Sequence, residues 1–414
     1  MCVETRRAVR IDNAVIFDGE EMLRDARRSI LIEDGEIVRI DRSEPSAGDD
    51  VEVIDAAGMT VMPGLIDAHF HCNSPSLNVA AADRMSASHM AQYARRYMED
   101  SLLRGFTTLR DAGGADTGLK QALAEGLIRG PRLFTSGLAL SQTGGHGDIR
   151  DGGVPSCGCA GYSGSLSRVV DGVDEMRRAV RDELRRGADQ IKLFVSGGVL
   201  SPTDPIWMEQ FTDDEIRAAV EEAERRRTYV MAHALTTQSV RRCAELGVRS
   251  IEHGLQMDRE TADFVAGSAS YVVATLLIVT SLAGGRLTLP PGALEKARRV
   301  AEQAVQAVEH GQAAGVRMGF GTDLLGELHG SELEELVVRA GVCGTLHTLR
   351  AATSVNAEIL DRKGVLGCVR PGARADLLVV DGDPLEDIGI LARPADHLKL
   401  IIKDGSVAAD NRTA

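Results

Sequence analysis

The sequence predicts an α/β protein: a (β/α)8 barrel of the TIM type, with a small β-sandwich built from both ends of the chain. Two observations indicate this fold. In the middle of the chain, short apolar runs alternate with stretches whose apolar residues recur at helical spacing. Near both ends, short β-type runs alternate with Asp-Gly and other turn signals. We therefore expect the barrel over residues 61–361 and the composite sandwich over residues 1–60 and 362–414.

Eight short apolar runs are the candidate barrel strands. In chain order they are GLIDAHF, FTTLRDA, RLFTSG, QIKLFVSG, YVMAHA, RSIEHG, YVVATLL and VRMGFGTD. Helix-like stretches such as VDEMRRAVRDELRRGA and TDDEIRAAVEEAERRR separate most of them. The second stretch begins with Thr212 and Glu215, which have the spacing of a capping box. Strand and helix thus alternate as a (β/α)8 barrel requires, and catalytic residues of such barrels sit at the carboxyl ends of the strands.

The two chain ends show a different pattern. The first 60 residues contain AVIFDGEE, SILIEDGEIVRI and VEVIDAAGMTVMPG, and the last 53 contain ADLLVVDGDPL and HLKLIIKDGSVAA. These are short β runs punctuated by turn residues, which suggests hairpins. Neither end is long enough to bury a core alone, so we expect the two ends to pair.

Length, composition and charge exclude several classes of protein. At 414 residues, the chain is long enough for one large and one smaller domain. The 47 basic and 61 acidic residues give a net charge of -14, which disfavours nonspecific binding to nucleic acid or to an anionic membrane. No stretch approaches the roughly 18 apolar residues of a membrane span. We expect a cytoplasmic protein with a small-molecule substrate.

The seven cysteines do not indicate a disulfide framework, because their number is odd and most are far apart. Only Cys157 and Cys159 are close together, and no second close pair of Cys or His accompanies them. A structural zinc usually needs such a second pair. We therefore expect reduced thiols in a loop.

Metal-capable residues follow the candidate strands. His69 and His71 end the first run, and alternate residues of a strand point the same way, so both imidazoles project from one face and can hold one metal ion. Taken alone, the pair fits two unrelated histidines at a strand end equally well. Four further residues lie at or near the ends of later runs: Lys192, His233, His253 and Asp323.

In this order, the strand-end residues resemble those of the amidohydrolase superfamily, and the resemblance covers nearly the whole chain. It implies two divalent metal ions bridged by a lysine that is carboxylated on its amine. The implied ligands are His69, His71, Lys192, His233, His253 and Asp323. Zinc is the expected ion, although histidine, carboxylate and carbamate ligands also suit manganese, cobalt or iron. The resemblance further implies a homo-oligomer.

The resemblance also implies a mechanism. A hydroxide shared by the two metal ions attacks the scissile carbonyl, and Asp323 takes the proton and passes it to the leaving amine. His146 lies in the long glycine-rich connection after the third run, within TGGHGD. It is either a turn histidine without a role or a group that contacts the substrate carbonyl and stabilises the developing oxyanion.

The segments TGGHGD and SGGVLSPTDPIWMEQ resemble a prolidase-like branch of the superfamily that is related to imidazolonepropionase-like hydrolases and cleaves dipeptides or N-acyl amino acids. This implies hydrolysis of an amide bond in Xaa-Pro or similar dipeptides, or in N-acylated amino acids. The alternatives are a hydrolase of another amide, such as a cyclic amide, a metabolite or a xenobiotic, and a deaminase. A non-catalytic scaffold is disfavoured, because it would be expected to lose ligands.

Three further residues are candidates for substrate contact. Trp207 either lines the pocket or packs its loop, and His329 follows Asp323 by a short loop. Leu235 lies two residues beyond His233, where relatives commonly carry a tyrosine that helps to hold the substrate carboxylate. This difference puts the carboxylate clamp in doubt and suggests a bulkier or less polar substrate.

Overall fold

The computed structural model describes residues 8–42, 51–150, 165–201, 204–290 and 292–412. Cys157 and Cys159 lie outside these residues. Contact density divides the chain into two compact units. One comprises the residues up to Asp67, Asp100–Thr108 and the residues from Leu336 onward, and the other comprises Ala68–Glu99 and Leu109–Glu335. The domain boundaries after residues 60 and 361 stay a prediction.

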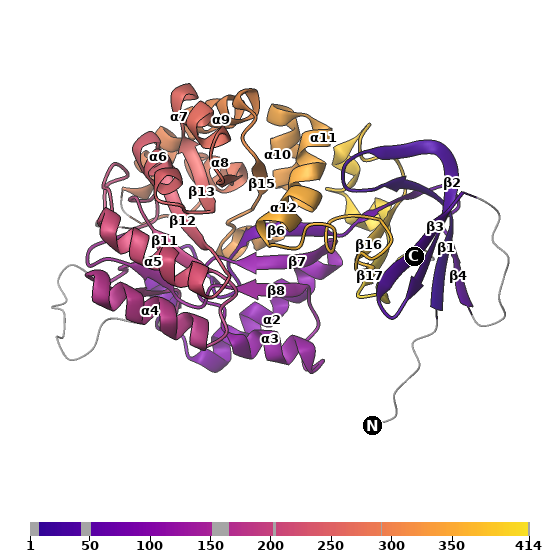
Figure 1. Cartoon of the computed structure of the whole chain (residues 1–414), viewed down its shortest axis with the longest axis horizontal. Helices are drawn as coiled ribbons and strands as arrows, with labels where there is room; N and C mark the ends of the chain where they lie inside the picture. Colours follow the sequence, from indigo (N-terminus) through magenta and orange to yellow (C-terminus); the bar gives the residue numbers. More distant parts are fainter. Residues whose placement is uncertain (1–7, 43–50, 151–164, 202–203, 291, 413–414) are drawn as a thin grey trace. The chain divides into compact units, whose positions relative to one another are not determined.

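The two chain ends form one sheet in the first unit (Figure 1). Its hydrogen-bonded order is β18 (Ser406–Asp410), β17 (Leu398–Lys403), β16 (Leu377–Val380), β5 (Thr60–Pro63), β1 (Ala8–Phe17), β2 (Met22–Glu33) and β3 (Glu36–Asp41), and β4 (Val51–Asp55) pairs with β1. The ends join where β5 runs antiparallel to β16, with Val61 opposite Val379. Strands from opposite ends of the chain therefore complete each other, as predicted.

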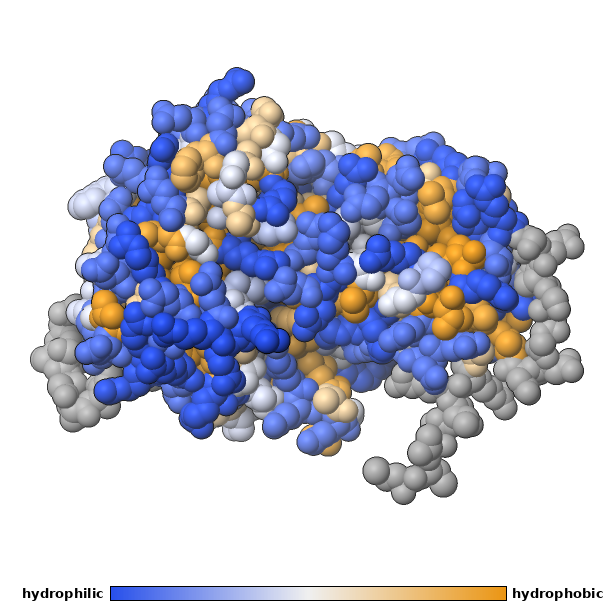
Figure 2. All heavy atoms as spheres, in the orientation of Figure 1, coloured by the Kyte–Doolittle hydropathy of each residue, from blue (hydrophilic) through white to orange (hydrophobic). Residues whose placement is uncertain are grey.

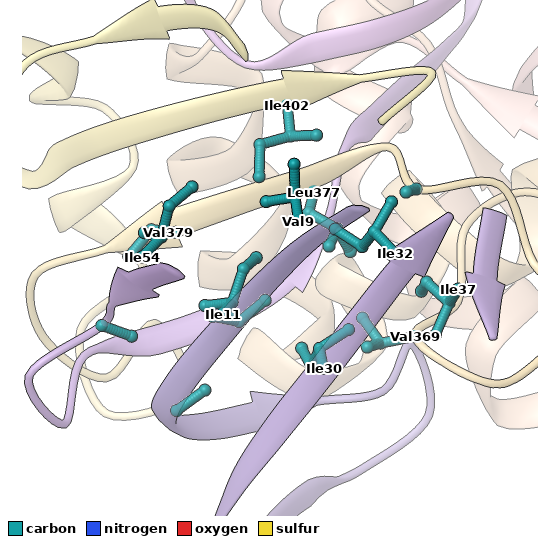
Figure 3. Close-up of a cluster of buried hydrophobic side chains, with 14 of the residues drawn as sticks. Val9, Ile11, Ile30, Ile32, Ile37, Ile54, Val369, Leu377, Val379 and Ile402 are labelled. Carbon is teal, nitrogen blue, oxygen red and sulfur yellow. The ribbon is translucent and has the colours of Figure 1, made fainter. Parts of the chain in front are cut away.

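The core of this sheet draws on both chain ends. Ile11 and Ile30 face each other in the β1–β2 register. Figure 3 shows them in the same cluster as Leu377, Val379 and Ile402 of the C-terminal strands. Leu377 and Val379 are two residues apart, so they share one face of β16. Burial of β-branched and leucine side chains from both ends explains why neither end folds into a core by itself.

The rest of the described strands form the barrel, and each of its eight main strands coincides with a predicted apolar run, although β12 and β13 extend two residues beyond theirs. The strands are β6 (Leu65–Phe70), β7 (Phe106–Asp111), β8 (Arg132–Thr135), β11 (Ile191–Phe194), β12 (Val230–Thr236), β13 (Ser250–Gln256), β14 (Tyr271–Ala274) and β15 (Met318–Phe320). Strands β6 to β8 are neighbours in one sheet, and β11 to β15 follow one another in parallel in a second sheet. That second sheet also contains β9 (Ala139–Ser141) and β10 (Ser167–Val169).

Two backbone hydrogen bonds join the two groups of barrel strands. The amide of Asp189 donates to the carbonyl of Thr135 at 2.7 Å, which links the residue before β11 to β8. The amide of Asp323 donates to the carbonyl of His69 at 2.8 Å, which links the end of β15 to β6. The strands thus close on themselves, and the predicted (β/α)8 fold class is confirmed.

The described helices comprise those that follow most of the barrel strands and one short helix that precedes β17. They are α1 (Val79–Ala82), α2 (Ala87–Leu103), α3 (Thr117–Ala124), α4 (Val173–Arg185), α5 (Asp213–Arg225), α6 (Thr237–Glu245), α7 (Arg259–Ala266), α8 (Leu276–Ala283), α9 (Ala293–Ala314), α10 (Glu334–Cys343), α11 (Thr345–Arg350), α12 (Asn356–Ile359) and α13 (Pro394–His397). Helix α5 begins with the predicted capping box, because the amide of Glu215 donates to Thr212 and the Glu215 carboxylate accepts from the Thr212 amide.

The surface agrees with the charged composition. Hydrophilic residues predominate on the face shown in Figure 2, with hydrophobic residues scattered among them. Of the helices within the described ranges, none combines the length and the apolar character that crossing a membrane requires.

Candidate active site

The carboxyl ends of the barrel strands deliver all of the predicted metal ligands to one cavity. Its volume is about 490 Å3. The predicted ligands that line it are His69, His71, Lys192, His233, His253 and Asp323. They come from β6, β11, β12, β13 and the residues after β15, which are far apart in sequence. Closure of the barrel is what brings them together.

Three of these residues form a tight group that fits a divalent cation. One ligand atom from each of His69, His71 and Asp323 lies within 4.8 Å of the other two. Asp323 Oδ1 is 3.4 Å from His69 Nε2 and 3.2 Å from His71 Nε2. Two imidazole nitrogens and a carboxylate oxygen are a donor set that zinc and related ions accept. The residues present therefore fit a metal ion.

The other predicted ligands surround this group more loosely. His253 Nδ1 is 3.9 Å from Asp323 Oδ2. The His253 ring centroid lies 4.7 Å from that of His69 and 4.7 Å from that of His233. Lys192 is 1% exposed and lines the same cavity. His253 and His233 thus adjoin the first group, and Lys192 lies on the wall of the same cavity.

The protein orients each histidine through one ring nitrogen, an arrangement that fixes the ring and its tautomer in metal sites. The contacts are His69 Nδ1 to Glu252 Oε2 at 2.6 Å, His71 Nδ1 to Gly113 O at 3.3 Å, His233 Nε2 to Gly197 O at 3.2 Å, and His253 Nδ1 to Thr275 Oγ1 at 2.9 Å. Burial, as the largest cause, lowers the pKa of His69, His233 and His253 well below the usual value. Neutral imidazoles, the form that binds metals, are therefore favoured.

The pKa values of three further groups that line the cavity are also shifted. Burial lowers the pKa of Lys192 to about 8, because the ammonium loses hydration. Burial raises the pKa of Asp323, but the charges of His69 and His71 and the hydrogen bond from His71 outweigh it, so the pKa is lowered overall. For His71, burial lowers the pKa, but the hydrogen bond to Asp323 and the charges of Asp323 and Asp111 together outweigh it, so the pKa is raised. These shifts favour an ionised aspartate beside a lysine that is partly neutral near pH 8.

Two of the predicted ligands have a backbone conformation that favours glycine. His253 has a φ of 73° and Asp323 a φ of 53°, both in the left-handed region. Non-glycine residues hold such conformations at a cost of order 1 to 3 kcal/mol, and they cluster at functional sites. The fold holds both side chains at the cavity against this local preference.

A buried ion pair behind His69 was missed by the sequence analysis. Glu252 accepts from Arg110 Nη2 at 3.0 Å and from Ser250 Oγ at 2.6 Å, and its second oxygen contacts His69. Both charged side chains are fully buried. The sequence did contain a signal for this pair, because Arg110 and Glu252 are charged residues inside apolar runs. A buried charge requires a partner. Which partner it takes was not readable from the runs themselves.

His146 reaches the cavity from the glycine-rich connection. Its ring stacks on that of His233, with the centroids 4.5 Å apart. Its Nδ1 lies 2.9 Å from Ser201 Oγ and 3.3 Å from Asp204 Oδ2. Polar partners on one edge of the ring therefore hold it beside the predicted ligands. Contact with a substrate carbonyl stays a prediction.

The remaining candidates separate into one that lines the cavity and two that do not. Leu235 lines it and is 3% exposed. Trp207 and His329 are not among the described residues that form its wall. Trp207 is 73% exposed. His329 lies in a short 3-10 helix and stacks on Tyr97, with the ring centroids 3.9 Å apart. His329 therefore packs against Tyr97, and substrate contact by Leu235, His146, Trp207 and His329 stays a prediction.

Comparison with known proteins identifies the family. The sequence profile of the amidohydrolase family matches residues 60–407. The chain belongs to the amidohydrolase family. Members of this family are hydrolases and are typically metal-dependent, in agreement with the donor set of His69, His71 and Asp323. The resemblance noted in the sequence is confirmed.

Its relatives include enzymes that cleave amide bonds. Ochratoxinase of Aspergillus niger is 32% identical over 352 residues, which span 81% of this amidohydrolase and 72% of ochratoxinase. A prolidase solved in complex with N-methylphosphonate-L-proline superposes with a TM-score of 0.93 at 41% identity, covering 97% of this chain and 100% of the prolidase. A Xaa-Pro dipeptidase with bound methionine gives a TM-score of 0.86 at 31% identity, covering 97% and 99%.

Proposed function

We propose that this amidohydrolase is a binuclear metal-dependent hydrolase that cleaves the amide bond of dipeptides, Xaa-Pro or similar, or of N-acyl amino acids. The observation that carries the proposal is the convergence of the six strand-end residues on one cavity, with His146 beside them. The similarity to a prolidase, a Xaa-Pro dipeptidase and ochratoxinase supports amide substrates.

The proposed ligands divide between two ions. His69 and His71 would hold the first ion, His233 and His253 the second, with Asp323 on the first and Lys192 between them. When bound, two divalent ions, expected to be zinc, supply Lewis acidity that activates water and polarises the scissile carbonyl. All other steps fall to side chains of the chain itself.

Lys192 has to change its charge to serve as a bridge. A buried ammonium beside two cations would be strongly unfavourable. Because the pKa of Lys192 is lowered to about 8, part of the amine is neutral near neutral pH. A neutral amine can add to carbon dioxide, with loss of a proton, to give a carbamate. The product is an anion with two oxygens in place of a cation.

Asp323 is suited to move the proton of the reaction. Its pKa is lowered, mainly because His69 and His71 outweigh the effect of burial, so it is an ionised base at neutral pH. It would take a proton from the attacking water and pass it to the nitrogen of the leaving amine. General acid–base catalysis of this kind contributes typically about 10²- to 10⁴-fold.

His146 is suited to stabilise charge on the substrate. With Nδ1 held by Ser201 and Asp204, its other edge is left for the cavity. A donor placed before the reaction begins stabilises an oxyanion without reorganisation at that moment. We assign His146 to the scissile carbonyl oxygen.

A substrate panel tests the proposal. Purified protein loaded with zinc would be offered Xaa-Pro dipeptides, other dipeptides and N-acyl amino acids, with amine release as the readout. We expect release from members of the panel, loss of that release after chelation, and recovery when divalent metal is returned. No release from any member by protein that holds two ions per chain would contradict it.

A further inference from the structure

Although polar residues such as Asn78 and Ser201 also line the cavity, one part of its wall beyond the proposed ligands is apolar. It is formed by side chains of β12, β13, α8 and α9, namely Leu235, Leu255, Ile278, Val279, Leu282 and Val300. Each is at most 5% exposed, and four of the six are leucine or isoleucine. A cavity of about 490 Å3 is within the range of roughly 300 to 1,000 Å3 that holds drug-sized ligands. The volume is sufficient for an amide that carries apolar substituents.

Two of these leucines are tied to the proposed ligands by the strands. Leu235 follows His233 by two residues in β12, and Leu255 follows His253 by two residues in β13. Both leucines line the cavity, as do both histidines. The same two strands that present the histidines therefore present apolar surface directly beside them.

The helical part of the wall is held in place. Helix α8 has the sequence LLIVTSLA, and its first two amides, of Leu276 and Leu277, donate to the buried carboxylate of Glu335 at 3.1 and 2.5 Å. Ile278 and Val279 follow these amides and face the cavity. A helix anchored at its N-terminus by a carboxylate gives a preformed wall.

Cationic side chains contribute little to this lining. Lys192 is the sole lysine or arginine among the described residues that line the cavity, and it belongs to the proposed metal ligands. Residues 151–164, 202–203 and 291, which adjoin lining residues in the sequence, contain no lysine, arginine or histidine. Arg150 is bound by both oxygens of Asp148, each at 2.6 Å. The apolar residues of the wall offer a carboxylate no hydrogen-bond donor, so a carboxylate placed against them loses hydration without gaining a partner.

We propose that, among the amides this site could hydrolyse, the cavity favours uncharged amides with apolar substituents over the dipeptides and N-acyl amino acids of the proposed function, and that it requires no carboxylate on the amine side. Because this selection concerns the proposed amide hydrolysis, it rests on the proposed function. In the reaction the C–N bond breaks, the hydroxyl of water joins the acyl carbon, and its proton joins the amine. The products are an apolar carboxylic acid and an apolar amine.

A matched pair of substrates tests the selection on the natural protein. N-hexanoyl-leucine carries a carboxylate, and N-hexanoyl-isopentylamine is the same amide without it. With amine release as the readout, we expect kcat/KM to be higher for the uncharged amide, by about tenfold or more, because the free acid must desolvate its carboxylate. Equal or better turnover of the free acid overturns the proposal.

Binding separates this inference from the proposed function. The same two compounds would be titrated calorimetrically into metal-loaded Asp323→Asn, in which turnover is expected to be slow. Tighter binding of the uncharged amide supports the selection even if neither compound is hydrolysed, and in that case the proposed function alone fails. Tighter binding of the free acid overturns the selection whether or not hydrolysis occurs.

Variants locate the effect. Leu235→Arg places a cation in the wall and is expected to raise kcat/KM for the free acid relative to the uncharged amide by about tenfold. Val305→Arg introduces the same charge at a residue of α9 that is 40% exposed, and the ratio should stay unchanged. If Arg150→Gln lowers turnover of the free acid selectively, Arg150 is a carboxylate clamp and the proposal is wrong.

Discussion

The floor of the cavity consists of titratable side chains, whereas the wall consists of apolar ones. The floor is formed by the six proposed ligands, which are titratable side chains. Two of them, His253 and Asp323, have backbone φ angles in the left-handed region. The wall is formed by Leu235, Leu255, Ile278, Val279, Leu282 and Val300, which are apolar side chains on regular strands and helices. The floor tolerates strain and desolvation, which proteins accept where chemistry requires it. We therefore expect variants of the floor to change the rate or the metal content for every substrate, and variants of the wall to change the preference between substrates.

The largest effect is expected at Lys192. Lys192→Arg keeps a positive charge that cannot be lost and cannot form a carbamate, so the second ion should bind poorly. Activity should fall by about 10³-fold or more, since the Lewis acidity of a metal ion is worth several kcal/mol. The fall should be similar for every substrate. Metal analysis and kcat/KM measure it.

A rescue variant and a control variant accompany Lys192→Arg. Lys192→Ala should be partly rescued by a short carboxylic acid, which restores bridging oxygens. Lys120→Arg, at a partly exposed ion pair with Asp189, is the matched control and should be unaffected. Full metal content and full activity in Lys192→Arg would rule out the bridging role.

Asp323→Asn keeps the shape and one oxygen of the side chain but removes the base. Turnover should fall by about 10²-fold or more, the usual contribution of general acid–base catalysis. Metal content should be measured in the same preparation, because Asp323 also belongs to the tight donor group. Near-normal turnover with metal still bound would assign the proton transfer to another residue.

His146→Ala should lower kcat and kcat/KM together, by about 10²-fold, because the proposed contact is made mostly in the transition state. Metal content should be unchanged, since His146 is not among the proposed ligands. An increase in KM alone, with kcat preserved, would show that His146 only binds the substrate.

Glu252→Gln tests a residue that contacts the proposed ligand His69 but is not itself a proposed ligand. It weakens the acceptor that orients His69 and leaves the buried Arg110 without its full counter-charge. Metal affinity should fall by about 10- to 100-fold, as for other groups that orient metal ligands. Competition with a chelator measures it. Glu260→Gln, at a side chain that is 86% exposed, should leave the affinity unchanged.

The smallest effect is expected on the wall. Leu235→Tyr offers a hydroxyl to a substrate carboxylate, and a hydrogen bond to a charged group is worth roughly 1.5 to 3 kcal/mol. Turnover of a free acid should improve relative to the same substrate with its carboxylate amidated. Equal change on both would place Leu235 away from the carboxylate and would weaken the separation between floor and wall.

Much of the floor was readable from the sequence because its information is local. Alternation along a strand places His69 and His71 on one side, and the end of an apolar run marks where a barrel strand stops. Each proposed ligand could therefore be assigned to the carboxyl end of a strand before any contact was known. The pairing of the chain ends was predictable for a similar reason, since neither end carries enough apolar residues for its own core.

Tertiary structure decided the features that depend on partners distant in sequence. The pairing of Glu252 with Arg110 joins residues 142 positions apart. Because both side chains are buried, water cannot solvate either charge, and each requires the other as its partner. His329 follows Asp323 closely, yet it stacks on Tyr97 and stays out of the described cavity wall. The apolar wall likewise exists only because closure of the barrel brings α8 and α9 beside β12 and β13. Hydrophobic burial has no direction of its own, so only the fold determined which apolar residues line the cavity.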